Sequence, residues 1–378
     1  MAIPLWLERA AFKAGMKSQL TYEWLVRPAA YAMSGWDAEQ VHDLGIEMLN
    51  RYEEVLQDMA PEFCVGPLYT ILNSKAIMPF GTAGGMDKNG EALVPLSHVF
   101  GFLESGTVTF EPRDGNPRPR IVAANGDIYN AQGLPSRGVV NFLKNVKNYR
   151  YSRTGKPVYA NITGIPGSRG LDDAYHETDL LLTTLSRNVD GFVWNPSCPN
   201  SNDLVQLRSS NTFREYAELF AKRANDKLKL VKISPYEFED VDARRDALQM
   251  ADAWMAGGGD GFVAVNTYSV PRDKVPSNEW GHKSAGRSGK FLKPYMLRAV
   301  RDMRSAFPKS VIIGVGGIET SGDAYETFAA GADAVEAYTA YAVHGFGALH
   351  EMMHGLANRL EREGYEHLEE FKYAKWPK

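Results

Sequence analysis

The chain has 378 residues, of which 44% are hydrophobic and 23% charged, so it is long enough for one barrel-sized domain plus an extension and has an ordinary composition for a soluble globular protein. Its net charge of -4 and its lack of a basic block give no electrostatic basis for binding nucleic acid. Its two cysteines, Cys64 and Cys198, do not make a disulfide framework, which favours a reducing compartment.

Residues 1–70 are predicted to form a helical N-terminal extension. Apolar and basic residues recur at helical spacing over 4–13, and a second helix is expected to start near Trp36, with Ser34 as a candidate cap. Apolar residues then repeat at spacings of three and four: Val41, Leu44, Met48 and Leu49. Since no run of about 18 apolar residues and no leader pattern is present, we expect neither a membrane-spanning segment nor a secretory signal.

From about residue 76, short apolar segments alternate with longer helical ones. The candidate strands are residues 77–83, 100–107, 158–162, 191–195, 228–233, 261–266, 311–315 and 334–338. Such strands indicate a parallel sheet that is buried on both faces. Eight units over roughly 250 residues predict a closed (β/α)8 TIM barrel, which we assign to residues 71–378. A doubly wound open sheet is the alternative.

Polar residues gather where the expected strands end, which is the face on which barrel enzymes place their chemistry. Three of these ends carry Asn161, Asn195 and Asn266, although asparagine is uncommon in strands. We therefore expect a pocket that recognises amide and carbonyl groups through hydrogen bonds.

The loops after the last two strands predict a phosphate site. Gly316 and Gly317 follow the seventh strand and let the backbone approach a ligand closely, while Thr339 follows the eighth strand. The alternative is that the two glycines only make a tight turn.

Two lysines stand out. Lys88 lies in a glycine-rich loop after the first strand, and Lys232 lies inside the apolar fifth strand. A buried lysine is costly unless it has an anionic or acceptor partner. Three interpretations of Lys232 stay open: an outward salt bridge, a cation near the electron-rich ring of a cofactor, and the Schiff-base lysine of an aldolase.

Cys198 is the sharpest single candidate for catalysis. A lone cysteine is usually a small buried hydrophobic residue. This one follows a strand end, in a proline-bounded loop between Asn195 and Asn200. That setting favours a thiol that acts as a general base.

Several segments of the chain resemble the dihydroorotate dehydrogenase family. They include Gly85-Met86-Asp87-Lys88-Asn89-Gly90-Glu91, Glu104-Ser105-Gly106-Thr107, Gly115-Asn116-Pro117-Arg118-Pro119-Arg120, Asn195-Pro196-Ser197-Cys198-Pro199-Asn200 and Ile313-Gly314-Val315-Gly316-Gly317-Ile318. The resemblance runs in family order and implies an FMN-dependent oxidation of dihydroorotate to orotate, a step of pyrimidine biosynthesis.

The resemblance also implies roles for individual residues. The implied cofactor contacts are Ala83, Gly84, Thr107, Asn161, Asn195, Lys232, Gly289, Gly316, Gly317, Tyr338 and Thr339. The implied substrate contacts are Lys88, Asn130, Gln132, Gly133, Leu134, Asn195, Asn200, Asn266 and Thr267. Cys198 matches the catalytic base, which takes a proton from the ring CH2 while hydride moves from the neighbouring carbon to the flavin.

The sequence mixes two types within that family. Its N-terminal region resembles the quinone-dependent, membrane-associated type, which usually has serine as the base, whereas Cys198 and Gly133-Leu134-Pro135 resemble the soluble type. Gln132 stands where methionine is usual, and Val265 stands where the quinone type has threonine. The stretch 269–283 is expected to be an irregular loop that reshapes the substrate lid.

These departures leave other functions open. A related cyclic amide or ureide is the alternative substrate, and a Lys232-dependent lyase or a flavin protein without turnover is the second alternative. The chain offers no cysteine cluster for an iron–sulfur centre. The reaction direction and the oligomeric state also stay open.

The N-terminal helices imply a quinone tunnel that rests on a membrane surface. The residues that suit an interfacial helix pair are Trp6, Phe12, Trp24 and Trp36 with Arg9, Lys13 and Lys17. The alternative is an amphipathic pair packed on the barrel, with the aromatic residues in its core. We expect a cytoplasmic protein, or a peripheral one on a membrane that faces a reducing compartment.

Overall fold

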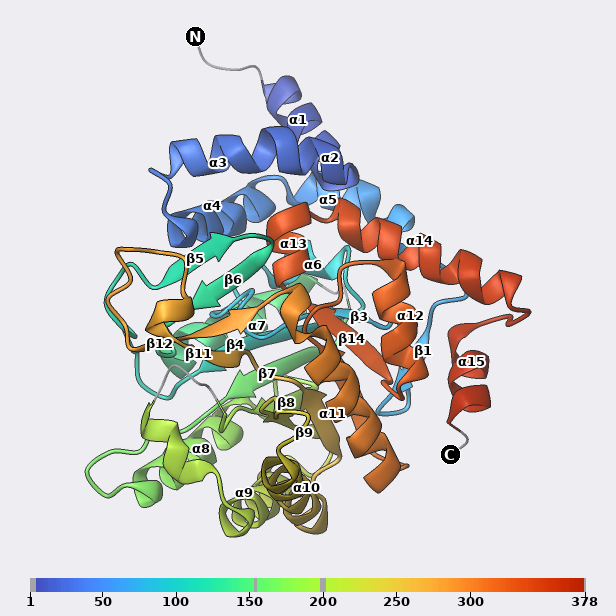
Figure 1. Ribbon diagram of the computed structural model, residues 1–378. Helices are drawn as coiled ribbons and strands as arrows, with labels where there is room; N and C mark the ends of the chain where they lie inside the picture. Colours follow the sequence, from blue (N-terminus) through green and yellow to red (C-terminus); the bar gives the residue numbers. More distant parts are fainter. Residues whose placement is uncertain (1–4, 153–154, 198–201, 377–378) are drawn as a thin grey trace.

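The computed structural model describes residues 5–152, 155–197 and 202–376, and its centre is a closed barrel of eight parallel strands (Figure 1). The strand order around the barrel is β10-β13-β14-β3-β4-β7-β8-β9. These strands are β3 (Phe80–Thr82), β4 (Phe102–Val108), β7 (Val158–Ile162), β8 (Gly191–Trp194), β9 (Leu228–Ile233), β10 (Gly261–Ala264), β13 (Val311–Val315) and β14 (Ala334–Ala337). Each overlaps a predicted strand, so the predicted TIM barrel is confirmed.

Side chains alternate between the inside of the barrel and the surrounding helices, as the two-residue period of a strand requires. The inner cluster includes Phe102, Tyr159, Val193, Leu230 and Ile313 from five different strands. The helices that follow the strands are α6 (Leu93–Ser97), α7 (Gly138–Ser152), α8 (Leu171–Leu185), α9 (Ser210–Arg223), α10 (Val241–Ala256), α11 (Lys293–Ala306), α12 (Ser321–Ala329), α13 (Thr339–His344) and α14 (Gly347–Arg362). The hairpin of β1 (Thr70–Leu72) and β2 (Lys75–Ile77) precedes the barrel, and α15 (Leu368–Lys375) follows it.

A second, four-stranded sheet was not predicted. We call it the roof sheet; its order is β11-β12-β6-β5, and its pairs are antiparallel. The members are β5 (Ile121–Ala124), β6 (Asp127–Asn130), β11 (Tyr268–Pro271) and β12 (Ser284–Ser288). The expectation of an irregular loop over 269–283 is wrong at its start, since β11 covers 268–271, and Trp280 is fully buried against the sheet.

The N-terminal region is helical, and Figure 1 shows it beside the roof sheet and α13. Its helices are α1 (Leu5–Lys17), α2 (Gln19–Thr21), α3 (Arg27–Met33), α4 (Ala38–Arg51) and α5 (Glu53–Met59). The predicted Ser34 cap is wrong: Asp37 caps α4, because its carboxylate accepts hydrogen bonds from the backbone of Glu39 (2.8 Å) and Gln40 (3.3 Å). Among the described residues, none of the helices has the length and apolar character needed to cross a bilayer.

Helix α4 is fastened to the chain that leads into the roof sheet. The buried Glu39 carboxylate accepts hydrogen bonds from Arg120, at 2.8 Å from Nη2, and Arg120 also donates to the carbonyls of Asp114 (2.6 Å) and Asn116 (2.7 Å). A buried guanidinium that binds a carboxylate and two carbonyls has good geometric complementarity. The N-terminal helices are therefore joined to the loop that follows β4.

Candidate active site

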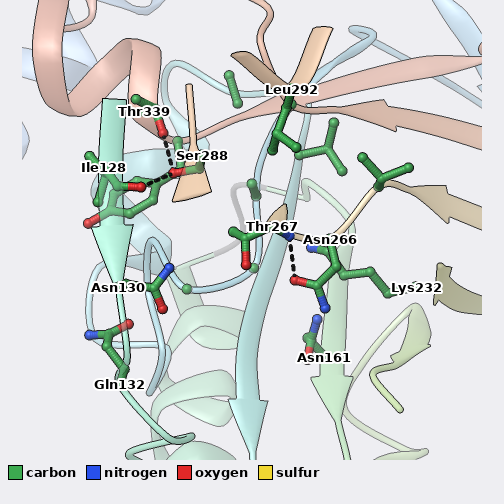
Figure 2. Close-up of a pocket in the computed structure, with 18 of the residues that line it drawn as sticks. Ile128, Asn130, Gln132, Asn161, Lys232, Asn266, Thr267, Ser288, Leu292 and Thr339 are labelled. Atoms are coloured by element: carbon green, nitrogen blue, oxygen red, sulfur yellow. Dashed lines mark hydrogen bonds between the residues drawn. The ribbon is translucent and has the colours of Figure 1, made fainter. Parts of the chain in front are cut away.

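A cavity of about 1180 Å³, including the space at its mouth, lies between the C-terminal ends of the barrel strands and the roof sheet. All of the predicted site residues within the described chain line it: Ala83, Gly84, Lys88, Thr107, Asn130, Gln132, Gly133, Leu134, Asn161, Asn195, Lys232, Asn266, Thr267, Gly289, Gly316, Gly317, Tyr338 and Thr339. Cys198 and Asn200 lie outside the described residues. Figure 2 shows Asn130 and Gln132 on one side of the cavity and Lys232 and Asn266 on the other.

One end of the cavity, which we call the amide end, is a chain of side-chain hydrogen bonds. Asn266 Nδ2 donates to Asn195 Oδ1 (3.1 Å), and Asn195 Nδ2 donates to Thr107 Oγ1 (2.9 Å). Thr107 Oγ1 in turn donates to Asn161 Oδ1 (2.6 Å). Because these residues come from four different strand ends, the chain of bonds fixes the orientation of every amide toward the cavity.

Lys232 points into the barrel, so the interpretation of an outward salt bridge is wrong. Its Nζ donates to Glu104 Oε1 at 3.2 Å, and Asn161 Nδ2 donates to the same oxygen at 2.7 Å. Glu104 has no exposed surface, and Lys232 is 5% exposed. A Cβ at Gly84 would lie 2.1 Å from Glu104 Oε1, so the ion pair requires a glycine there.

Lys88 lies on a loop that is held by its neighbour Asp87. The Asp87 carboxylate accepts hydrogen bonds from the backbone of Glu91 (2.8 Å) and Ala92 (2.9 Å). Burial raises the pKa of Asp87 to about 6, although these N–H donors oppose the shift. Burial lowers the pKa of Lys88, and the carboxylate of Glu39 opposes that shift. An anionic ligand in the cavity would therefore stabilise the charged form of Lys88.

The opposite end of the cavity, which we call the glycine end, is mostly backbone. Gly289, Gly316 and Gly317 have φ values of 114°, 119° and 71°, a region that favours glycine. The hydroxyls of Ser288 and Thr339 lie 2.9 Å apart beside them, and Ser288 Oγ donates to the carbonyl of Ile128 (Figure 2). Backbone of this kind presents N–H groups to an anion, as a phosphate site requires.

Two polar atoms in the cavity wall have no hydrogen-bond partner among the residues that the structure describes. Gln132 Nε2 and Thr267 Oγ1 are both buried and without a hydrogen bond. A buried donor without an acceptor costs free energy, about 1–3 kcal/mol, unless a ligand or water takes the bond. The cavity therefore fits a ligand that offers acceptor atoms at these positions, and its two ends suit a ring system and a phosphate respectively.

The N-terminal helices reach the cavity at Tyr338. The Tyr338 hydroxyl and His42 Nδ1 of α4 are 3.1 Å apart, and burial lowers the pKa of His42 well below its usual range. Trp6, Trp24 and Trp36 are 70–79% exposed, as the interfacial interpretation expects. Phe12 instead packs on Tyr52 with ring centroids 4.9 Å apart, as the alternative interpretation expects.

Sequence reasoning assigned no role to Glu104, Glu336 or Ser288. Glu104 and Glu336 are buried carboxyls inside apolar strands, at 0% and 1% exposure. The argument that singled out Lys232 in an apolar strand applies equally to these two glutamates. Nothing in the sequence around Ser288 indicated a role in the site, because Ser288 reaches the cavity through the pairing of β12 with β6 in the roof sheet, which was not predicted.

Comparison with known proteins gives a consistent result. The family model for dihydroorotate dehydrogenase matches residues 68–360. A dihydroorotate dehydrogenase (quinone) from Bordetella avium is 31% identical over 357 residues, which cover 88% of this chain and 97% of that protein. One from Methylococcus capsulatus is 30% identical and covers 88% and 98%. A crystal structure of the dihydroorotate dehydrogenase of Eimeria tenella with ferulenol superposes with a TM-score of 0.75 at 25% identity, covering 88% and 94%.

Proposed function

The chain belongs to the dihydroorotate dehydrogenase family, and we propose that it oxidises L-dihydroorotate to orotate with a bound FMN and passes the electrons to a quinone. It is an oxidoreductase that acts on a CH–CH bond. The observation that carries the proposal is one cavity that joins an amide end, a lysine and a glycine end. All the predicted cofactor and substrate contacts within the described chain line that cavity.

The glycine end suits the phosphate of FMN. Gly289, Gly316 and Gly317 would offer backbone N–H groups, and Thr339 would add a hydroxyl. Lys232 would face the ring system as a cation. When bound, the flavin accepts the electrons and the hydrogen that leave the substrate.

The substrate would lie between the amide end and the roof sheet. Lys88 would pair with its carboxylate, while Asn195 and Asn266 would donate to its carbonyls and stabilise negative charge there. Cys198 would remove the proton next to a carbonyl. Ser197, the last described residue before it, donates its hydroxyl to the Lys232 carbonyl at 2.9 Å.

The direct test is anaerobic addition of L-dihydroorotate to the purified protein while the visible absorbance is recorded. We expect a yellow protein whose flavin absorbance bleaches. A yellow protein that does not bleach would contradict dihydroorotate as the substrate and keep the cofactor. A colourless protein that does not take up FMN would contradict the cofactor as well.

For the quinone, the contact of Tyr338 with α4 supports a route through the N-terminal helices. We propose that the exposed tryptophans also rest on a membrane surface. Removing residues 1–65 should abolish quinone reduction and leave flavin reduction by dihydroorotate intact. The milder variant Trp24→Ser/Trp36→Ser should lose binding to phospholipid vesicles without loss of flavin. Full quinone turnover in the truncated protein would contradict the proposed route.

Gln132 favours a second candidate, a related cyclic amide or ureide with one more acceptor. Gln132 lines the cavity, and its buried Nε2 has no hydrogen-bond partner among the described residues. A substrate that accepts this bond would gain over one that does not. The lysine-dependent lyase is not supported, because Lys232 Nζ is already engaged by Glu104 Oε1 at 3.2 Å, whereas a Schiff-base lysine needs an amine that is free to attack a carbonyl.

A further inference from the structure

Directly below the amide end, the barrel interior contains a second buried carboxyl, Glu336 of β14. It lies two residues after Ala334, which belongs to the inner apolar cluster, and so shares its inward face. It is 1% exposed. Glu104 of β4 and Lys232 of β9 are on the same inner surface, so two carboxyls and one ammonium group meet there.

The hydrogen bonds of these groups are incomplete if both carboxyls are ionised. Glu104 Oε1 accepts from Asn161 and Lys232, but Glu104 Oε2 has no donor among the described residues. Neither oxygen of Glu336 has a hydrogen bond within the described chain. Three acceptor atoms without a donor, on two adjacent anions, would be very costly in a buried site. A single proton on Glu336 gives that side chain an O–H donor for the neighbouring carboxylate.

We propose that Glu336 is protonated in the folded protein at neutral pH and donates its O–H to Glu104, which holds Glu104 in place for Asn161 and Lys232. Glu336 is thus a positioning residue for the amide end and touches no ligand itself. With the proton, the charges of Glu104 and Lys232 cancel. Without it, the site would carry a net negative charge beneath the ring of a bound flavin.

The electrostatic surroundings support this assignment. Burial, and after it the charge of Glu104, raises the pKa of Glu336 well above its usual range, and Lys232 opposes the shift. The other titratable groups that interact with it are Tyr159 of β7 and Tyr341 of α13. Burial raises the pKa of both phenols, so both stay neutral. Lys232 is therefore the only cation that faces Glu336 in the described chain, and it is already paired with Glu104.

Infrared spectroscopy of the purified full-length protein tests directly whether the Glu336 carboxyl group is protonated. At pH 7 we expect a carboxylic-acid C=O band that shifts in D2O and is missing from Glu336→Gln. The exposed Glu361→Gln should keep the band and serves as the matched control. A wild-type spectrum without a band that Glu336→Gln removes would overturn the proposal.

The pH dependence of stability gives a second measurement. A carboxyl with a raised pKa in the folded state binds a proton that the unfolded chain has already lost, so stability falls as pH rises from the unfolded toward the folded pKa. Between pH 5 and 8, the Tm of wild type should therefore fall relative to that of Glu336→Gln, and Glu361→Gln should show no such trend. A Tm difference between wild type and Glu336→Gln that stays constant with pH would contradict the assignment.

The consequence for the ligand rests on the proposed function, so it is measured separately. Glu336→Leu removes the donor and should weaken FMN binding about tenfold, whereas Glu336→Gln restores a donor and should bind FMN as wild type does. Equal FMN affinity in the leucine variant would contradict the positioning role. If wild type itself takes up no FMN, the proposal of FMN as the cofactor is contradicted. The infrared and Tm results still show whether Glu336 is protonated.

Discussion

The two ends of the cavity are built from different parts of the chain. The amide end consists of side chains from four strands that bond to one another, whereas the glycine end consists of backbone that is exposed because side chains are absent. Substitutions at the two ends should therefore have different effects. A change at the amide end removes a chemical group, and a change at the glycine end adds one. Variants of the substrate contacts at the amide end, such as Asn266, should alter rate or substrate affinity with flavin retained, and variants at the glycine end should lose flavin.

The largest effect is expected at the residue that would complete the amide end. Cys198→Ala should slow flavin reduction by dihydroorotate roughly 10²- to 10⁴-fold, because a positioned base contributes about that much. The FMN content should stay at the wild-type level, and Cys198→Ser should also be slower than wild type. Anaerobic stopped-flow absorbance measures the rate. A Cys198→Ala protein with the full rate would remove Cys198 from its assigned role.

At the glycine end, Gly317→Ala should weaken FMN binding about 5- to 150-fold, the equivalent of roughly 1–3 kcal/mol of backbone strain. The φ of Gly317 is 71°, and a Cβ there would lie 2.5 Å from the backbone nitrogen of Lys293. The control is Gly322→Ala nearby, where the nearest atom to a Cβ is the Thr320 hydroxyl at 3.6 Å. Flavin released during gel filtration is the measurement. Normal FMN retention in Gly317→Ala would contradict the expectation that the glycine end binds the flavin.

Asn266→Ala should raise the KM for dihydroorotate about 5- to 150-fold, because it leaves buried groups without partners at a cost of about 1–3 kcal/mol. Asn266 donates to both Asn195 Oδ1 and Ser197 Oγ, so its neighbours lose their orientation too. Steady-state kinetics and the flavin absorbance of the same sample are compared. Loss of flavin in place of substrate affinity would show that the two ends are not independent.

The smallest effect is expected at the cavity wall. Gln132→Met removes an N–H that has no partner among the described residues, and it should weaken binding of the true substrate about 5- to 10-fold, which corresponds to one neutral hydrogen bond of roughly 1 kcal/mol. Titration of the oxidised protein with orotate, followed by the flavin spectrum, gives the affinity. Unchanged or tighter binding would mean that Gln132 does not contact this ligand and would favour the second candidate substrate.

The barrel could be predicted because its strands are buried on both faces and therefore appear as short apolar runs. Strands β7, β9 and β13 begin and end where the sequence predicted. The roof sheet has no such pattern, since all four residues of β5 are only half-buried. One signal was present: Asn125-Gly126, both with positive φ, forms the two-residue turn between β5 and β6.

Much of the candidate site could also be predicted, because polar residues at the ends of apolar strands are visible as residue types. The roles of Lys232 and Glu336 could not be settled that way, because an inward or outward side chain depends on the register with which the barrel closes. The cap of α4 shows the same limit locally, since Ser34 and Asp37 are both good capping residues and only the backbone path selects Asp37.

The roof sheet has a consequence for local unfolding. Ser288 of β12 bonds to Ile128 of β6 across 160 positions of sequence, so the loops that follow β4 and β10 form one hydrogen-bonded unit. Loops tied together in this way open with a single free energy and not one after the other. The amide hydrogens of β6 and β12 should therefore exchange with solvent together, and entry of a ligand from the roof side requires both loops to open in the same event.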